Sequence, residues 1–327
     1  MCAFNAITDV PGIKVGNAED LRACTGCTVV LCETGAVTGV DVRGGAPGTR
    51  EIACLNPVNL ITYTHAVYLG GGSSFGLEGA YGVMRYLEER DIGFDAGVAK
   101  VPIVPGAVLF DLRIGSSSVR PGKIMGYQAA ENAGSGAVPQ GNVGAGTGAT
   151  IGKALGTMYM MKGGLGTASV ITGDLIVGAL VAVNCFGDII DPKTGSIIAG
   201  TRTKDRKSFA NSMNILSEAS HKEKESFSDA TTIAVIATNA RLTKAEATKV
   251  AMMAHNGYAR TIRPVHTMYD GDTIFCLSTG PVVAMVSAVG ALAAEAVSAA
   301  VISGIKAART LRHVLSYDEL HEKNDRK

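Results

Sequence analysis

The segment Thr231-Thr232-Ile233-Ala234-Val235-Ile236-Ala237-Thr238 changes the character of the chain at its first residue. A polar, charge-rich stretch, 202–229, precedes it, whereas its own β-branched and apolar residues favour the half-buried surface of a core strand. Thr231 therefore stands where a loop enters a strand. Cleavage just before it would expose an α-amine that titrates at about pH 7.7–8.0 and lets the threonine supply its own base. Taken alone, the segment is more simply explained as an ordinary strand that begins with two threonines.

The composition argues against several classes of protein. The chain has 327 residues, 46% of them hydrophobic, so it can bury a sizeable core. A net charge of +1, no tryptophan and 5% aromatic residues give no basis for binding nucleic acid or an anionic membrane. Seven scattered cysteines, an odd number, are typical of reduced thiols. The first residues lack a basic region followed by an apolar stretch, so we expect a cytoplasmic protein.

No motif predicts a metal or a cofactor. Cys24-Thr25-Gly26-Cys27 has the spacing of half a zinc site, but no second pair completes it, and ordinary buried thiols are favoured. The glycine-rich segment 141–156 gives a loose dinucleotide fingerprint, but no apolar strand precedes it, and the spacing of a phosphate loop also fails. The remaining interpretation is a cleft walled by glycine with one cation, Lys153.

A rival nucleophile lies in the segment Gly72-Ser73-Ser74-Phe75-Gly76. It matches the nucleophile-elbow pattern between a predicted strand at 66–69 and a predicted helix at 77–89. Ser74 would then be an esterase nucleophile, served by a later aspartate and by one of three histidines, His255, His266 and His313. Repeated strand–helix units do not follow, however, so we favour a glycine loop that brings a helix close to a strand. In that case Gly72, Ser73 and Ser74 are candidates for lining a substrate pocket.

Polar residues at the ends of predicted strands are further candidates. Asn184 ends a strand-like run that begins at Ser169, and an amide there can anchor a loop or donate to an oxyanion. Asp270 and Asp272 flank a glycine before another apolar strand. Acids around a turn glycine are common on plain surfaces, so we expect this pair to lie outside the core.

Two helices are predicted in the C-terminal third. Thr243-Lys244-Ala245-Glu246 is a capping box that begins a helix reaching about Tyr258. The alanine-rich segment 281–305 is nearly long enough to span a bilayer, but it holds Glu295 and lacks basic flanks. We therefore predict a buried helix between layers and no membrane association.

The N-terminal segment 7–50 alternates short apolar runs with turn signals. This pattern predicts separate strands at 28–31 and 37–40, and we expect an antiparallel sheet here.

Five blocks, in this order, resemble the DmpA-type aminopeptidases and their relatives, the β-aminopeptidases and nylon-oligomer hydrolases. The blocks are 7–16, 41–45, 71–77, 146–150 and 263–267. The resemblance covers most of the chain and implies one domain over 1–327. Its fold would be of the α/β (α+β) class, an αββα sandwich that resembles N-terminal nucleophile hydrolases with different connectivity.

The resemblance also implies self-cleavage between Ala230 and Thr231. The products would be a large chain, 1–230, and a small chain, 231–327, with 202–229 as an exposed linker before the cut. Members of this family often have Asn or Gly where this chain has Ala230, which cannot assist the cut with a side-chain amide.

By the same resemblance, Thr231 is the nucleophile of the mature enzyme. Lys153 and Asn184 match a lysine and an asparagine of the nylon-oligomer hydrolase site, and Asp270 and Asp272 fall where those enzymes keep an acidic pair. Phe110 stands where some members have a tyrosine, and it is a candidate for the substrate pocket.

The expected activity is that of an aminopeptidase or amidase without a cofactor or metal. Small peptides, amino-acid amides and oligomers of β- or ω-amino acids are all possible substrates. The family implies a homo-oligomer, a tetramer or larger. Two alternatives stay open at this point: an esterase that uses Ser74, and an unprocessed, non-catalytic member in which Ala230 prevents the cut.

Overall fold

A computed structural model describes residues 3–220 and 230–320. Among these residues, nine strands form one hydrogen-bonded sheet in the order β10-β11-β14-β16-β2-β4-β7-β3, with β1 paired to β2. The strands of this sheet are β1 (Lys14–Asp20), β2 (Thr25–Val42), β3 (Gly48–Arg50), β4 (Tyr63–Gly70), β7 (Gly106–Val108), β10 (Gly164–Thr172), β11 (Leu175–Asn184), β14 (Thr231–Ala240) and β16 (Thr273–Val282).

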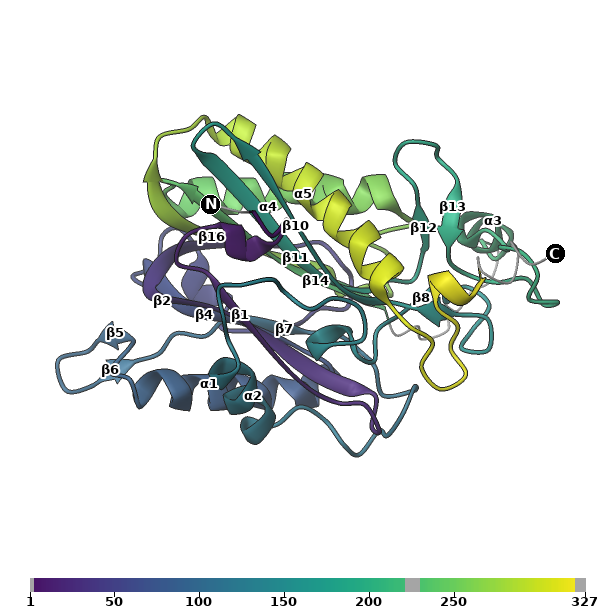
Figure 1. Ribbon diagram of the computed structural model, residues 1–327, viewed down its shortest axis with the longest axis horizontal. Helices are drawn as coiled ribbons and strands as arrows, with labels where there is room; N and C mark the ends of the chain where they lie inside the picture. Colours follow the sequence, from purple (N-terminus) through teal and green to yellow (C-terminus); the bar gives the residue numbers. More distant parts are fainter. Residues whose placement is uncertain (1–2, 221–229, 321–327) are drawn as a thin grey trace.

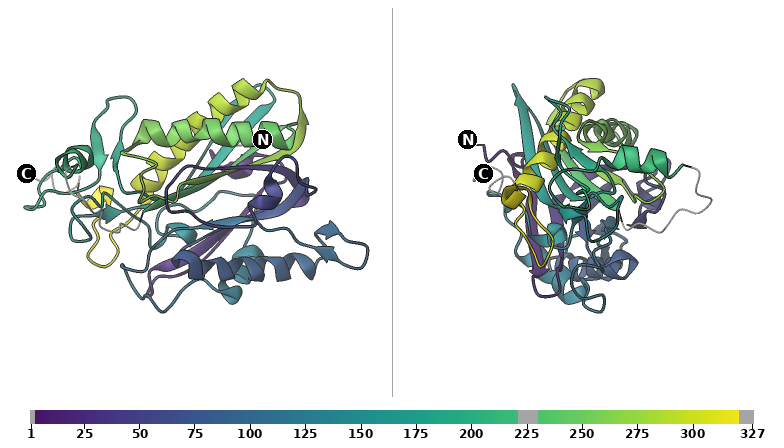
Figure 2. Two further views of the ribbon diagram at one scale, coloured as in Figure 1. Left: turned by 180° about the vertical axis from the view of Figure 1, so that it is seen from behind. Right: turned by 90° about the vertical axis from the view of Figure 1, so that its right-hand side faces the viewer.

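Helices cover the sheet on two opposite sides (Figure 1). In that view α4 and α5 lie above the strands, while α1 and α2 lie below them, and Figure 2 shows the same layers from behind and from the side. The helices of the described residues are α1 (Gly79–Glu88), α2 (Lys123–Glu131), α3 (Ser212–Glu218), α4 (Lys244–Thr261) and α5 (Val286–Ala307), with short 3-10 turns η1 (Ile7–Asp9), η2 (Ala53–Leu55), η3 (Ser73–Glu78) and η4 (Gly144–Gly146). Short paired strands complete the structure: β5 (Phe94–Asp95) with β6 (Lys100–Val101), β8 (Thr150–Ile151) with β9 (Met161–Lys162), and β12 (Asp188–Ile190) with β13 (Ile197–Ala199) and β15 (Ile262–Arg263).

Alternation along the strands divides the apolar residues among three main cores. In β14, Ala234 and Ile236 face α4 and α5, whereas Ile233 and Val235 face the middle of the molecule. In β4, every second side chain faces the middle of the molecule, and the side chains between them pack against α1 and α2. Because successive side chains of a strand point to opposite faces, this pattern requires two sheet layers between two helix layers. The predicted αββα sandwich is confirmed.

Strand β2 connects the two sheet layers. The sequence analysis predicted separate strands at 28–31 and 37–40, but the structure has one strand of 18 residues. Its pairing with β4 is irregular between Leu31 and Ala36, which lets the strand change direction without ending. The antiparallel pairing predicted for the N-terminal segment is confirmed by β1 and β2.

The predicted C-terminal helices are confirmed with shifted boundaries. The capping box at Thr243 and Glu246 begins α4, as the sequence indicated. Helix α5 begins only at Val286, because residues 281 and 282 belong to β16. This helix is apolar and long enough to cross a membrane, but 61% of its most hydropathic window is buried, and it packs against α4, β10 and β11. These contacts are those of a core helix.

Residues 202–220 are anchored to the core at two points. Arg202 and Ser212 are buried, and the carboxylate of Asp188 accepts hydrogen bonds from the Ser212 backbone N–H at 2.6 Å and from its hydroxyl at 2.7 Å. Asn211 then caps α3 with its side chain. This part of the predicted exposed linker is therefore partly buried and partly helical, because Asp188 holds it. Residues 221–229 lie outside the described part.

Candidate active site

Thr231 is the first residue of β14, and its side chain is buried. Its strand partner is Asn184, the last residue of β11, so the two predicted site residues face each other across one step of the sheet. The Thr231 hydroxyl contacts the carbonyl oxygen of Ala230, the residue before it. The backbone N–H of Gly271 donates to that same oxygen at 3.2 Å. The scissile carbonyl of the predicted cut thus has a hydroxyl and a hydrogen-bond donor beside it.

Gly271 must be glycine for steric reasons. A Cβ atom added there would lie 2.6 Å from the Ala46 carbonyl oxygen and 2.9 Å from Thr231 Oγ1. Both distances are shorter than carbon–oxygen contacts allow, and one of them involves backbone that cannot move aside. The missing side chain therefore allows the 270–272 turn to approach the hydroxyl closely.

Asn184 is held in one orientation by its neighbours. Its Oδ1 accepts a hydrogen bond from Lys153 Nζ at 3.0 Å and from the Thr150 backbone N–H at 2.9 Å. Both groups are donors only, so the amide oxygen must face them, and Nδ2 donates on the other side to the Phe110 carbonyl oxygen at 3.2 Å. Lys153 also donates to the backbone oxygen of Asn184 at 3.1 Å. The structure thus brings Lys153, Asn184 and Phe110 together.

The acidic pair is buried, and the expectation of a surface turn is wrong. Asp270 is 1% exposed and Asp272 is fully buried, since residues 43–46 of the chain cover their turn with backbone hydrogen bonds. Asp272 Oδ1 accepts from the Thr232 backbone N–H at 2.7 Å. Asp270 accepts from the Phe186 N–H at 3.2 Å and from the Thr267 hydroxyl at 2.6 Å. Burial and the neighbouring Asp272 charge raise the pKa of Asp270 to about 7.

His266 is a residue of this site that the sequence analysis did not assign to it. Its Nδ1 lies 2.8 Å from Asp272 Oδ2, and its backbone N–H donates to the same oxygen at 3.2 Å. The sequence indicated only that His266 belongs to a block shared with the family. Its contact with Asp272 depends on a turn with φ of +56° at His266, which no spacing rule reveals.

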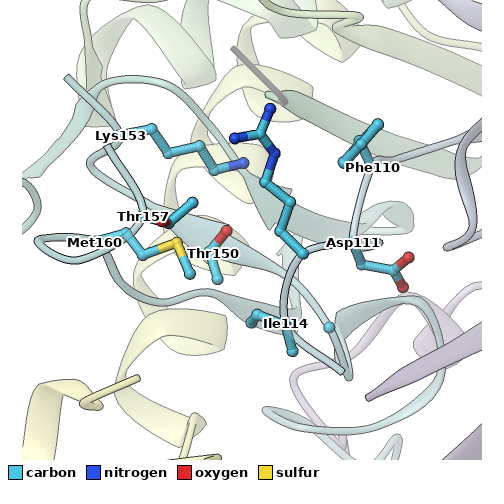
Figure 3. A pocket seen from close by; sticks show the side chains of 9 residues that line it. Phe110, Asp111, Ile114, Thr150, Lys153, Thr157 and Met160 are labelled. Carbon is cyan, nitrogen blue, oxygen red and sulfur yellow. The ribbon is translucent and has the colours of Figure 1, made fainter. Parts of the chain in front are cut away.

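A pocket opens beside the Lys153–Asn184 contact (Figure 3). It contains about 250 Å³ of empty space, part of it open to solvent. Its lining combines apolar, polar and cationic side chains: Phe110, Asp111, Arg113, Ile114, Gly148, Thr150, Lys153, Thr157 and Met160. In Figure 3, Lys153 and Phe110 lie on opposite sides of the pocket, with Thr157 and Met160 beside Lys153. Lys153 thus lines a pocket as predicted, but glycine does not form its walls, because the lining includes one glycine, Gly148, and Arg113 is a second cation.

Asp111 is tied to the loop that follows β4. Its Oδ2 accepts from the Thr25 hydroxyl at 2.7 Å, and its Oδ1 accepts from the Gly72 N–H at 2.7 Å. Burial raises the pKa of Asp111 to about 6. Gly72 therefore supports the pocket from behind through Asp111, whereas it is not itself part of the lining.

The Ser74 alternative gains no support from the geometry. Ser73 is half-buried and Ser74 is exposed at the start of η3. Within the described residues, no histidine makes a hydrogen bond with Ser74. His255 contacts the Asp41 carbonyl oxygen and His266 contacts Asp272, while His313 is exposed. Residues 3–220 and 230–320 also contain no cluster of three or more potential metal ligands among His, Cys, Asp and Glu.

Comparison with known families gives a match to the model described as peptidase family S58, over residues 5–316. The chain belongs to peptidase family S58. An uncharacterized aminopeptidase of Mycobacterium tuberculosis is 41% identical over 351 aligned positions, which cover 97% of this chain and 98% of that protein. A 6-aminohexanoate-oligomer endohydrolase of Kocuria sp. is 34% identical, with 91% of this chain and 85% of that protein covered.

Solved structures of similar fold agree with the S58 assignment. The L-aminopeptidase D-Ala-esterase/amidase of Ochrobactrum anthropi, described as a variant of the Ntn hydrolase fold, superposes with a TM-score of 0.70 at 19% identity, covering 99% of this chain and 95% of that one. A β-aminopeptidase of Burkholderia sp. gives a TM-score of 0.67 at 24% identity, covering 99% and 94%. The resemblance inferred from the sequence is confirmed, and the chain is an S58 aminopeptidase or amide hydrolase.

Proposed function

We propose that the chain cuts its own Ala230–Thr231 bond and then hydrolyses amide bonds of small substrates with Thr231 as an N-terminal nucleophile. One observation carries this proposal: the Thr231 hydroxyl and the Gly271 N–H meet at the carbonyl oxygen of Ala230. A nucleophile and an oxyanion donor are the two groups that peptide cleavage requires at that carbonyl.

In the self-cleavage step, Thr231 Oγ1 bonds to the carbonyl carbon of Ala230. The bond from that carbon to the Thr231 nitrogen breaks, and the hydroxyl proton passes to the departing amine. The product is an ester between Ala230 and Thr231, which water hydrolyses to a free carboxylate and a free hydroxyl. The Gly271 N–H stabilises the charge that develops on the carbonyl oxygen. Ala230 is small and buried, so it does not obstruct this attack.

In turnover, the freed amine of Thr231 takes the proton of its own hydroxyl as that oxygen attacks the substrate carbonyl. The substrate amine leaves with this proton, and water then hydrolyses the acyl-threonine ester. Asn184 faces Thr231 across the strands, and its amide oxygen is turned toward Lys153 and Thr150, so that Nδ2 is the donor side of the amide. We propose that the Asn184 amide stabilises the oxyanion of the substrate carbonyl. Lys153 fixes the Asn184 amide and contributes positive charge beside it.

The acidic pair has a structural role in this scheme. Asp272 holds the backbone of Thr232, and Asp270 holds Phe186 and Thr267, so their oxygens already accept hydrogen bonds from the chain. We therefore propose that the pair sets the position of Thr231 and Gly271. This scheme does not require the pair to bind a cationic substrate amine.

The substrate class follows from the pocket and from the relatives. Phe110, Ile114 and Met160 offer apolar contact, while Lys153 and Thr150 offer polar contact near the nucleophile. Curated relatives are named for oligomers of 6-aminohexanoate, and a structural neighbour is named a β-aminopeptidase. We propose short linear amides of amino acids as substrates. The pocket is too small for a folded protein chain to enter.

Intact mass measurement and N-terminal sequencing test the proposal. The expected products are fragments 1–230 and 231–327, the second beginning with Thr231. An intact chain that hydrolyses amides would overturn the nucleophile assignment, as would a fragment that begins at any other residue.

A homo-oligomer, a tetramer or larger, and a cytoplasmic location stay predictions from the sequence. Sedimentation equilibrium at micromolar concentration tests the first of them. A clean monomer with full activity would contradict it.

A further inference from the structure

We propose that His266 is a positioning residue of this active site, which donates from Nδ1 to Asp272 and thereby orients that carboxylate toward the backbone that follows the nucleophile. The inference rests on the proposed function, because it concerns how Thr231 is held. It adds a residue for which the sequence patterns and the resemblance assigned no such role.

Asp272 connects His266 to the nucleophile strand. One carboxylate oxygen receives both the Nδ1 and the backbone N–H of His266, at 2.8 and 3.2 Å. The other oxygen receives the Thr232 N–H at 2.7 Å. A movement of the His266 ring therefore rotates the carboxylate and shifts the peptide next to Thr231. A displacement of about 1 Å near a reacting group can cost about a hundredfold in rate.

The tautomer of His266 follows from its partners. Asp272 accepts a hydrogen bond from the Thr232 N–H, and it also contacts the backbone nitrogen and Nδ1 of His266. Because a carboxylate accepts hydrogen bonds, Nδ1 must carry the proton. In a neutral ring Nε2 is then an acceptor. It is buried, and within the described residues it has no hydrogen-bond partner.

The ring of His266 also packs against side chains of α4. His255 packs against His266 with ring centroids 4.8 Å apart, and Tyr258, also from α4, lies 6.2 Å away. Burial and the His266 ring lower the pKa of His255 to about 3, with Arg43 acting in the same direction. An Asp41 carboxylate oxygen lies 3.5 Å from His255 Nε2. Beside His266, the acids are Asp272 and its neighbour Asp270. The two imidazoles thus pack against each other beside Asp272.

The backbone at His266 is adapted to this contact. Its φ of +56° lies in the left-handed region, which costs most residues about 1–2 kcal/mol and is tolerated by Gly and Asn. In this conformation the backbone and the ring reach the same oxygen. A His266→Gly variant removes only the side chain, and His266→Asn keeps both the backbone preference and a side-chain N–H donor.

The experiment compares four purified, full-length proteins: wild type, His266→Gly, His266→Asn and His313→Ala. His313 is exposed and serves as the matched control. For each protein, kcat and KM for an amino-acid amide are measured from pH 5 to 9, together with the fraction cleaved at Thr231 and the melting temperature.

We expect His266→Gly to lower kcat by about 10–100-fold with little change in KM, as for loss of a hydrogen bond to a charged group. We also expect the acidic limb of its profile to move to higher pH, because the Asp272 carboxylate loses a hydrogen-bond donor that favours its charged form. His266→Asn should recover most of the rate, and His313→Ala should match wild type.

A wild-type kcat and pH profile in His266→Gly would overturn the inference. A loss that is uniform in pH, lowers the melting temperature and is not recovered by Asn would also overturn it, because that result marks a purely structural residue. Failure of the proposed function is distinguished by Thr231→Ala: if that variant is inactive while His266→Gly behaves as wild type, only the inference about His266 falls.

Discussion

The two candidate nucleophiles, Thr231 and Ser74, differ in what surrounds them. Thr231 is buried, faces Asn184 across the sheet and contacts the carbonyl that it would attack. Ser74 is exposed on η3 and has no histidine partner in the part of the chain described. Ser74 has the better-known motif, but Thr231 has the environment of a nucleophile. Activation of a hydroxyl depends on neighbours that are distant in sequence, so a local pattern is weak evidence for it.

The largest effect is expected from Thr231→Ala. This variant should remain a single chain and lose amide hydrolysis by at least about a thousandfold, since both reactions use the same oxygen. Thr231→Ser should retain part of each activity because it keeps that oxygen.

Thr232→Ala is the matched control for these variants. It removes a neighbouring threonine side chain but leaves the backbone N–H that binds Asp272. Gel electrophoresis and amide turnover measure both reactions. Wild-type turnover in Thr231→Ala would contradict the nucleophile assignment and make Ser74 the next residue to test.

A smaller loss is expected from Gly271→Ala. The added methyl group meets the Ala46 carbonyl at 2.6 Å and the Thr231 hydroxyl at 2.9 Å, so the turn must retreat and move its N–H away from Ala230. We expect self-cleavage to slow by about 10–100-fold, in line with the loss of one oxyanion donor or part of it. A time course of fragment formation measures the rate.

Gly136→Ala is the control for the turn variant, because a Cβ at Gly136 meets no atom within 4 Å. It should be processed at the wild-type rate. Equal rates in the two alanine variants would show that the 270–272 turn takes no part in the cut.

For the acidic pair we expect a moderate effect on the dependence of melting temperature on pH. The pKa of Asp270 rises from 3.8 to about 7 on folding, so the folded state binds this proton more tightly than the unfolded state. The resulting stabilisation is complete below about pH 4 and is lost as the pH rises through about 7. Asp270→Asn mimics the protonated form and should flatten the dependence of melting temperature on pH between 4 and 7.

Asp205→Asn is a suitable comparison because Asp205 is an exposed acid. Melting temperatures of wild type and both variants are measured at half-unit intervals of pH. An unchanged slope in Asp270→Asn would mean that Asp270 is ionised throughout this range.

The smallest effect is expected from Ser74→Ala. The side chain is exposed, and Gly72 rather than Ser74 binds the pocket residue Asp111. Self-cleavage and amide turnover should stay within about twofold of wild type, since surface substitutions of this kind usually change stability by less than 0.5 kcal/mol. Loss of esterase activity with normal processing would instead reveal a second site.

Much of the fold was predictable because its signals are local. The run of β-branched and apolar residues in 231–238 predicts a core strand, and the capping box at Thr243 predicts where α4 begins. The prediction failed where one strand serves two layers. The turn-forming residues between Leu31 and Ala36 suggested a break, but a bulge in β2 absorbs them.

The candidate site was predictable only in part, and through resemblance more than through spacing. Lys153, Asn184 and Phe110 are far apart in sequence, and the structure brings both Lys153 and Phe110 into contact with Asn184. The burial of Asp270 and Asp272 was missed because acids around a glycine are usually solvated. Here the backbone of residues 43–46 covers them.

By itself, the sequence determined the strand that begins at Thr231, the apolar residues that fill the core of two sheet layers, and the order of blocks that marks the family. These are properties of neighbouring residues, and each follows from side-chain type and period. Only the tertiary structure decided that Gly271 binds the Ala230 carbonyl, that Asn184 faces Thr231, and that His266 holds Asp272. The geometry of these contacts is set by strand register and by a left-handed turn, and neither can be inferred from local composition.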